Sequence, residues 1–247
     1  MDFRLRLGGL EFVGGAGSPR YTVAAISGLE SVGIRRENTE RPNAHGSFPA
    51  PGYFESRRIS WSGLILTENE GEQDHAVRSL AGILGGGTGR LTAQGTSSVW
   101  TDVQRVSVES QIVTPGTVGS YSVSVEAPDP FLYGETVSFG PDVSVTVHHH
   151  GNTNAAPDVT VTGTMPSGYR VNGPGGAQYI VSQALTSAVT HRIDFNTGWL
   201  YRNGVLQQGA VSRAETFVIP PGVASAMSLT PVSGSGVLTA KLTDTFS

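Results

Sequence analysis

Apolar and polar residues alternate along most of this 247-residue chain, which is the two-residue period of β-strands with one buried face. The clearest run is residues 121–126, where Tyr121, Val123 and Val125 alternate with serine and glutamate. In the first half the same pattern predicts strands at residues 3–7, 21–26, 31–35, 58–66, 90–94, 100–113 and 118–126. Residues 41–53 hold three prolines and two glycines, so we expect a loop there that is too long for a tight hairpin.

One segment follows a helical period instead. Val77, Leu80, Ala81 and Leu84 recur at helical spacing, with acidic residues in the first turn and three glycines after the last apolar residue. The pattern predicts a single helix at about residues 70–84, lying over a sheet.

The second half of the chain predicts strands and no helix. Asn203-Gly204 is a strong signal for a two-residue hairpin turn. Strands are predicted at residues 143–147, 159–162, 189–195, 199–202, 205–207 and 237–242. Short strands separated by turns are typical of a β-sandwich or jelly roll.

A proline-rich corner separates the two halves. Residues 127–134 read APDPFLYG, and each of the two prolines removes a backbone donor from the strand ladder. We therefore predict a mainly β protein of two domains. Residues 1–134 form a β-sandwich-like domain with one α-helix, and residues 135–247 form an all-β sandwich or jelly-roll domain.

The composition excludes several classes of protein. The chain has no cysteine, which rules out disulfides and thiolate metal sites, and its net charge of −4 gives no reason to bind nucleic acid or an anionic membrane surface. No apolar run approaches the roughly 20 residues of a membrane-spanning helix, and the first residues begin a strand pattern rather than a signal peptide. Lys241 is the one lysine among 16 basic residues, which fits either arginine-rich interfaces or the base composition of the source genome.

Candidate metal-binding and catalytic residues are sparse. On a strand, His148 and His150 would share one face, but the sequence identifies no third ligand, and His149 is expected to pack at the strand end. Glycine-rich residues 14–17 and 85–89 lack the spacing of a phosphate-binding loop. The carboxylates available for glycoside hydrolysis are scattered: Asp129, Glu135, Asp142, Asp158, Asp194 and Glu215. We expect no enzyme activity, no metal and no cofactor.

Trp199 and Tyr201 lie on one predicted hairpin strand and share a face. Two aromatic rings on one face suit either a platform for a sugar ring or a strand that faces the core, and the alternation favours the core.

The order of these parts resembles the distal tail protein family of long-tailed phages (siphophages), also called phage tail or minor tail proteins. APDPFLYG is the most characteristic stretch. The matching stretches follow one another along nearly the whole chain, at residues 29–35, 41–46, 58–63 (RISWSG), 78–84, 127–134, 151–163, 193–204 and 219–222 (IPPG).

The resemblance implies a structural protein of the virion, located at the phage tail tip and assembled in the host cytoplasm. Family members form a hexameric ring that connects the tail tube to the baseplate or tail tip. Their N-terminal domains make the ring, and their galectin-like or jelly-roll C-terminal domains project from it. The implied partners are further copies of the chain, the tail tube protein, the tape-measure protein and the tail-tip or hub protein.

Five residues are candidates for the ring interface: Arg4 and Arg6 on the first strand, and Arg41, His45 and Gly46 in the long loop. An ordinary solvated strand face and a surface loop would explain the same residues. The alternative function is a monomeric carbohydrate-binding module or a cell-wall-binding accessory protein, which a mass measurement would distinguish from a ring.

Overall fold

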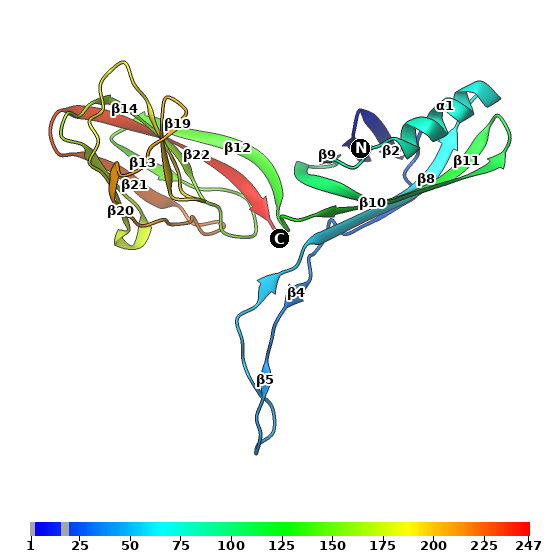
Figure 1. Ribbon diagram of the computed structural model, residues 1–247, viewed down its shortest axis with the longest axis horizontal. Coiled ribbons are helices and arrows are strands. Elements are labelled where there is room, and N and C mark those ends of the chain that lie inside the picture. The colour runs from blue at the N-terminus through cyan, green and yellow to red at the C-terminus, as the bar shows by residue number, and fades with distance from the viewer. Residues whose placement is uncertain (1–2, 16–19) are drawn as a thin grey trace. The chain divides into compact units, whose positions relative to one another are not determined.

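The computed structural model describes residues 3–15 and 20–247 of the chain. Two compact units make up the fold, one of residues 1–132 with Ser247 and the other of residues 133–246 (Figure 1). Part of the glycine-rich segment at residues 14–17 lies outside the described residues. Each unit is described by itself.

The first unit is built on one curved antiparallel sheet with a single helix. Its elements are β1 (Phe3–Leu7), β2 (Leu10–Gly14), β3 (Ala25–Ser27), β4 (Ile34–Arg35), β5 (Thr39–Glu40), β6 (Ser47–Phe48), β7 (Tyr53–Phe54), β8 (Arg57–Leu66), α1 (Glu70–Ala81), β9 (Thr88–Gln94), β10 (Ser98–Thr114) and β11 (Val118–Ala127). In the sheet, neighbouring strands follow the order β2-β1-β9-β10-β11-β8-β3. The predicted alternation on β11 is confirmed, because Tyr121, Val123 and Val125 are buried and the serines between them are not.

Residues 20–24 join the two sides of this curved sheet. On one side the backbone N–H of Val13 in β2 donates to the carbonyl of Tyr21 at 3.0 Å. On the other side the N–H of Thr22 donates to the carbonyl of Leu64 in β8 at 2.9 Å. The sheet therefore curls around a core that contains the rings of Phe12, Tyr21, Trp61 and Tyr121.

The predicted helix exists, but it is shorter than expected, and the face that it buries is shifted by about one residue from the predicted face. α1 ends at Ala81, with Gly82 as its C-cap, rather than at residue 84. Leu84 has a φ of 55°, which is outside the right-handed helical region. The buried positions are Gln73, Ala76 and Leu80, whereas Ala81 is exposed.

A capping interaction and a glutamine fix the start of α1. Asn69 is the N-cap, and its side-chain oxygen accepts from the N–H of Glu72 at 2.9 Å. The Gln73 amide donates to the carbonyl of Thr114 at 3.1 Å and accepts from the N–H of Gly116 at 2.9 Å. The helix is therefore tied to the β10–β11 turn, and it contacts β8 and β10 over the sheet.

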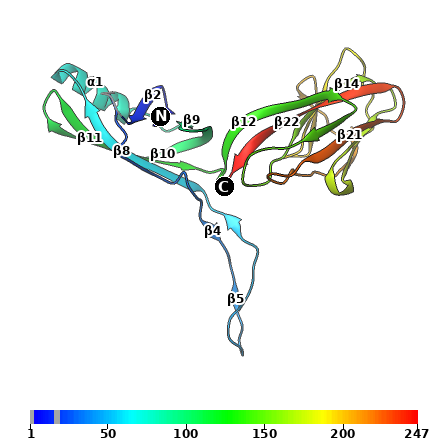
Figure 2. The same cartoon turned by 180° about the vertical axis from the view of Figure 1, so that it is seen from behind.

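The expected loop at residues 41–53 is instead the tip and one leg of a long hairpin, which we call the arm (residues 28–56). β4 pairs with β7 and β5 pairs with β6, and both figures show the arm extending away from the sheet (Figures 1 and 2). Pro49 and Pro51 lack an N–H, so the ladder is broken into two short pieces. Between the pieces, the N–H of Ala50 donates to the side-chain oxygen of Asn38 at 2.9 Å.

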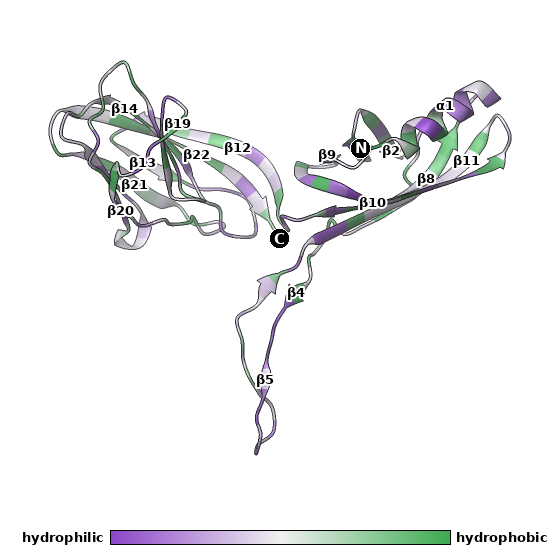
Figure 3. Ribbon diagram, viewed as in Figure 1, coloured by the Kyte–Doolittle hydropathy of each residue, from purple (hydrophilic) through white to green (hydrophobic). Residues whose placement is uncertain are grey.

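The second unit is a sandwich of two antiparallel sheets. Its strands are β12 (Leu132–Asp142), β13 (Ser144–Val147), β14 (Asp158–Thr164), β15 (Tyr169–Asn172), β16 (Gln178–Val181), β17 (His191–Asp194), β18 (Trp199–Arg202), β19 (Val205–Leu206), β20 (Val211–Ala214), β21 (Ser225–Pro231) and β22 (Ser235–Phe246), with a 3-10 turn at Pro174–Gly176. One sheet has the order β12-β22-β14-β17-β18-β19, and the other β13-β21-β15-β16-β20. Hydrophobic and hydrophilic bands follow one another along β22 (Figure 3), and Leu238, Ala240 and Leu242 of this strand are buried, as expected of a strand with one buried face.

The core of this sandwich confirms most of the predicted pattern. Val159, Val161, Ile193 and Phe195 are buried between the sheets. The Asn203-Gly204 turn joins β18 to β19, and both residues have the positive φ of a two-residue hairpin turn. The mainly β prediction is thus correct, and a sandwich forms in the second half.

Candidate subunit interface

Arg4 and Arg6 lie on the exposed face of β1, where the sequence placed them. Their register partners on β2 are Val13 and Glu11, and the Glu11 carboxylate accepts from Arg6 Nε at 3.0 Å and Arg6 Nη2 at 2.9 Å. Arg4 Nη1 lies 3.7 Å from the same carboxylate. All three side chains are well exposed, so these ion pairs contribute little to the stability of the unit.

Arg41, His45 and Gly46 lie at the tip of the arm. The N–H of Arg41 donates to the carbonyl of Gly46 at 3.1 Å, and Gly46 has a φ of 88° that closes the turn. The Arg41 guanidinium carbon is 5.2 Å from the centre of the Phe48 ring. The structure does not bring these residues to Arg4 and Arg6, which lie on the sheet and not on the arm (Figure 2).

The arm carries exposed apolar side chains that the sequence reading missed. The exposed fractions are 53% for Ile34, 55% for Phe48, 65% for Tyr53 and 40% for Phe54. A two-stranded ribbon cannot bury such side chains by itself. The available signal was the aromatic residues of two short pairs, Ser47-Phe48 and Tyr53-Phe54, each of which lies beside a proline or glycine. Aromatic residues next to turn residues favour short strands.

A second feature that the sequence did not predict is the open edge along residues 105–114 of β10, which we call the far half of β10. Pairing with β9 ends at Gln104, so among the described strands of the first unit residues 105–114 pair with β11 alone. Val106, Ile112 and Val113 on this half are about half exposed, and a bulge interrupts the register near Val106 and again near Val113. Unpaired backbone groups beside exposed apolar side chains form a template for another strand.

The opposite end of the same sheet is also open. β3 is the last strand in the order and pairs with β8 alone. The first unit therefore presents two different sheet edges, β10 on one side and β3 on the other.

The histidine triplet does not form a complete metal site. His149 is buried, as predicted, and its ring nitrogens lie 3.1 Å from the carbonyl of Ile219 and 3.1 Å from the N–H of Gly151. Since Nδ1 accepts from Gly151, Nε2 carries the proton that it donates to Ile219. The rings of His148 and His150 are exposed with centres 5.8 Å apart, and no group of three potential ligands occurs among the described residues.

Trp199 and Tyr201 do not face the core, contrary to the expectation from alternation. Leu200 between them is buried and lies opposite the buried Ile193, whereas Trp199 is 52% exposed. Tyr201 lies under the Arg192 guanidinium at 5.3 Å. The aromatic side chains therefore lie on the outer face of β18.

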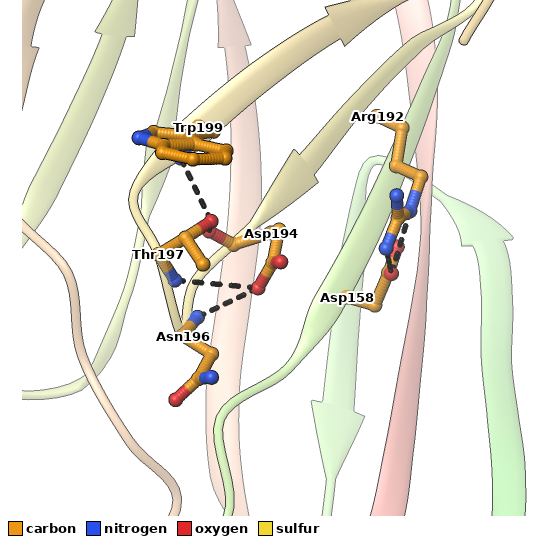
Figure 4. A network of polar contacts seen from close by, with 6 residues as sticks. All are labelled: Asp158, Arg192, Asp194, Asn196, Thr197 and Trp199. Atoms are coloured by element: carbon orange, nitrogen blue, oxygen red, sulfur yellow. Dashed lines mark hydrogen bonds and ion pairs between the residues drawn. The ribbon is translucent and has the colours of Figure 1, made fainter. Parts of the chain in front are cut away.

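The carboxylates near Trp199 are engaged in local contacts (Figure 4). Asp158 forms an ion pair with Arg192, which raises the pKa of that arginine. Asp194 accepts from the N–H of Asn196 at 2.9 Å and so closes the turn before Trp199. Asp158 and Asp194 are register partners on β14 and β17, and their contacts, to Arg192 and to the backbone of the turn, stabilise strand pairing and the turn.

Two titratable groups of the second unit with strongly shifted pKa values lie in its core. His191 is fully buried, and burial lowers its pKa to about 4. Its Nδ1 lies 3.0 Å from the Tyr169 hydroxyl, whose pKa is raised by burial, and its Nε2 has no hydrogen-bond partner in the described part of the chain. Both rings are packed between the two sheets, so this pair is part of the core and not a reactive site.

Comparison with known proteins places this geometry in a known fold. No protein family model and no curated protein sequence matches the chain. Among solved structures, the SPP1 Dit protein, described as a paradigm of hub adsorption apparatus in Gram-positive infecting phages, matches with a TM-score of 0.81 at 13% identity, over 99% of both chains. A chain in the phage P2 baseplate, in its activated conformation with Ca, matches with a TM-score of 0.52 at 10% identity, over 98% of this chain and 97% of the other. The chain therefore has the fold of the SPP1 Dit protein from end to end. No described helix is long and apolar enough to span a membrane.

Proposed function

We propose that this chain is a distal tail protein of a siphophage, a structural and non-enzymatic component of the virion at the tail tip. The observation that carries the proposal is the fold likeness to the SPP1 hub protein, which includes both units in the same order over nearly the whole of each chain. The alternative of a carbohydrate-binding module is not favoured, because these full-length matches are phage hub and baseplate structures.

The proposed role is a hexameric ring that connects the tail tube to the baseplate or tail tip. Its partners would be five further copies of the chain, the tail tube and tape-measure proteins, and the tail-tip or hub protein. Assembly would take place in the host cytoplasm. No cofactor, metal or nucleic-acid recognition is part of the proposal.

The first unit offers the surfaces that such a ring requires. A ring needs a heterologous interface, in which one surface of each copy meets a different surface of the next. The β10 edge and the β3 edge are two such surfaces, and pairing between them would bury Ile112 and Val113 while satisfying free backbone groups. The arm, with Arg41, His45 and Gly46 at its tip, would reach the neighbouring copy.

Mass in solution tests the ring. Six copies of the 25.8-kDa chain give about 155 kDa, which light scattering after size-exclusion chromatography separates from a monomer or dimer. Deleting residues 46–52 or changing Val113→Lys should weaken assembly, whereas Arg4→Glu with Arg6→Glu should have the smaller effect because both arginines are exposed. A loss of about 1.4 kcal/mol per interface reduces each pairwise constant tenfold, and the loss recurs at every contact around the ring.

Val232→Lys is the matched control for Val113→Lys. Val232 is 67% exposed against 59% for Val113, but it belongs to the second unit. A chain truncated after Leu132, where the first unit ends, should still assemble if the first unit makes the ring. A ring that survives the Val113 change and is lost on the Val232 change, or one held by residues 135–247 alone, would contradict this assignment.

A further inference from the structure

Arg57, the first residue of β8, is the largest fully buried side chain in the described structure, with 1% of its surface exposed. Its guanidinium is bonded to three backbone carbonyls from two distant segments. Nε donates to the carbonyl of Pro130 at 2.7 Å, and Nη1 donates to the carbonyls of Gly28 at 2.9 Å and Leu29 at 3.3 Å. One side chain thus joins the start of the arm to the proline-rich corner at residues 128–131.

Only an arginine can make this set of contacts. The guanidinium presents donors in fixed, coplanar directions, whereas a lysine ammonium is a point charge on a flexible stem. A buried charge is costly unless it is compensated: burial lowers the pKa of Arg57, the Glu30 carboxylate opposes this only in part, and Nη2 has no hydrogen-bond partner in the described part of the chain. The same carboxylate accepts from the N–H of Gly28 at 3.2 Å, so it also belongs to the arm base.

Other contacts bring the same segments together. The rings of Phe54, at the returning leg of the arm, and Phe131, in the corner, meet edge to face at 5.6 Å. Ser56 donates to the carboxylate of Glu126 near the end of β11. Gly28 has a φ of 90°, and a side chain there would meet the carbonyl of Arg58 at 2.0 Å, so the arm base passes directly over β8.

We propose that Arg57 is a positioning residue that couples the arm to the corner through which the chain leaves the first unit. The two segments are held together while the guanidinium bonds both, and they loosen together when it is removed. Any partner that binds the arm then changes how firmly residues 128–131 are held in place. The chain continues from these residues into the second unit. The coupling is a property of the single chain and does not depend on the proposed ring.

Hydrogen–deuterium exchange on the full chain tests the coupling, with Arg57→Met and Arg57→Lys as variants. Arg58→Met is the matched control, because Arg58 is the exposed neighbour on the same strand. In Arg57→Met, the backbone amides of residues 28–35 and those of Asp129, Phe131 and Leu132 in the corner should exchange at least about tenfold faster, since bonds to a charged donor are lost from both segments. Arg57→Lys should loosen both as well, because it keeps the charge but cannot bond all three carbonyls. The control should leave both segments unchanged.

Exchange in β9 and β10 decides between coupling and a general loss of stability. If it stays slow while the arm base and the corner loosen together, the proposal holds. Loosening spread evenly over the first unit would show that Arg57 is an ordinary core residue, and loosening of one segment alone would show that it couples nothing. Either result overturns the proposal. If Arg57→Met fails to fold, the Arg57→Lys data decide in the same way, and a light-scattering measurement on each variant reports separately on the ring.

Discussion

Stability of the second unit should fall in acid because of one buried histidine. His191 has a pKa of about 4 in the folded chain and 6.5 as an ordinary histidine. In the unfolded chain His191 therefore binds a proton near pH 6.5, whereas in the folded chain it binds one only near pH 4. Acid therefore favours the unfolded state. The contribution of neutral His191 is fully present above pH 6.5 and is lost as the pH falls to 4.

The size of the effect follows from the difference in pKa. A difference of about 2.5 units at 1.36 kcal/mol per unit gives about 3 kcal/mol of unfolding free energy between pH 7 and pH 4. That is a large fraction of the 5–15 kcal/mol typical of a domain. The variant His191→Gln has no group titrating here, so this part of its pH dependence should vanish, although it will be less stable at pH 7 if the contact with Tyr169 is lost.

Urea unfolding at several pH values between 4 and 7.5 measures the effect. Trp199 lies in the second unit and reports on it when Trp61 and Trp100 are replaced by Phe. His148→Gln is the control, because it removes an exposed histidine of the same unit that does not contact the buried pair of His191 and Tyr169. The reasoning is wrong if the free energy of unfolding of His191→Gln falls with acid as steeply as that of the unchanged chain.

Three further predictions concern single positions. Asn69→Ala removes the N-cap of α1 and should cost about 1 kcal/mol, seen as a lower Tm of the first unit, and Asn69→Asp should restore most of it. Gly63→Ala would place a Cβ 1.8 Å from the carbonyl of Thr22, so residues 20–24 must shift and stability should fall by about 1–3 kcal/mol in urea; an unchanged midpoint would contradict the close approach. Purified protein should retain no stoichiometric zinc by elemental analysis, and one ion per chain that disappears in His148→Ala would show that the histidines bind metal after all.

Much of the second unit was predictable because its signals are local. The alternation in β14 and β17 buries Val159, Val161 and Ile193 as expected, and Asn203-Gly204 supplies the positive φ values that its turn requires. The error at Trp199 has a definite cause. The run Trp-Leu-Tyr is apolar on both faces, so its period does not say which face is buried, and the pairing of Leu200 with Ile193 decides it.

The first unit shows where local signals run out. The existence of α1 follows from its period and from the glycines that end it, but the buried face depends on Gln73, a polar residue that bonds to a turn 41 residues away. Arg57 is buried only because carbonyls from residues 28, 29 and 130 converge on it. Nothing in the neighbourhood of Arg57 in the sequence indicates that convergence.

The candidate interface was predictable in part, for the same physical reason. The sequence predicted a long loop at residues 41–53 but not its strand pairing. The strands there are only two residues long, and the neighbouring Pro49 and Pro51 argue against a strand pattern. It also missed the open half of β10, because strand length can be read from alternation but the absence of a neighbour cannot.

One part of the sheet of the first unit is closed by backbone hydrogen bonds, and another part has an open edge with exposed apolar residues. Residues 20–24 bond to both β2 and β8 and so remove two edges, as soluble β proteins commonly do. The same unit leaves the far half of β10 without a partner on the side away from β11, with Ile112 and Val113 exposed, and it extends an arm with further exposed apolar side chains. Neither feature adds to the stability of a single chain, and both expose surface that promotes association. The closed part accounts for the fold of the unit, and the open part is the surface that the proposed ring would cover with a neighbouring chain.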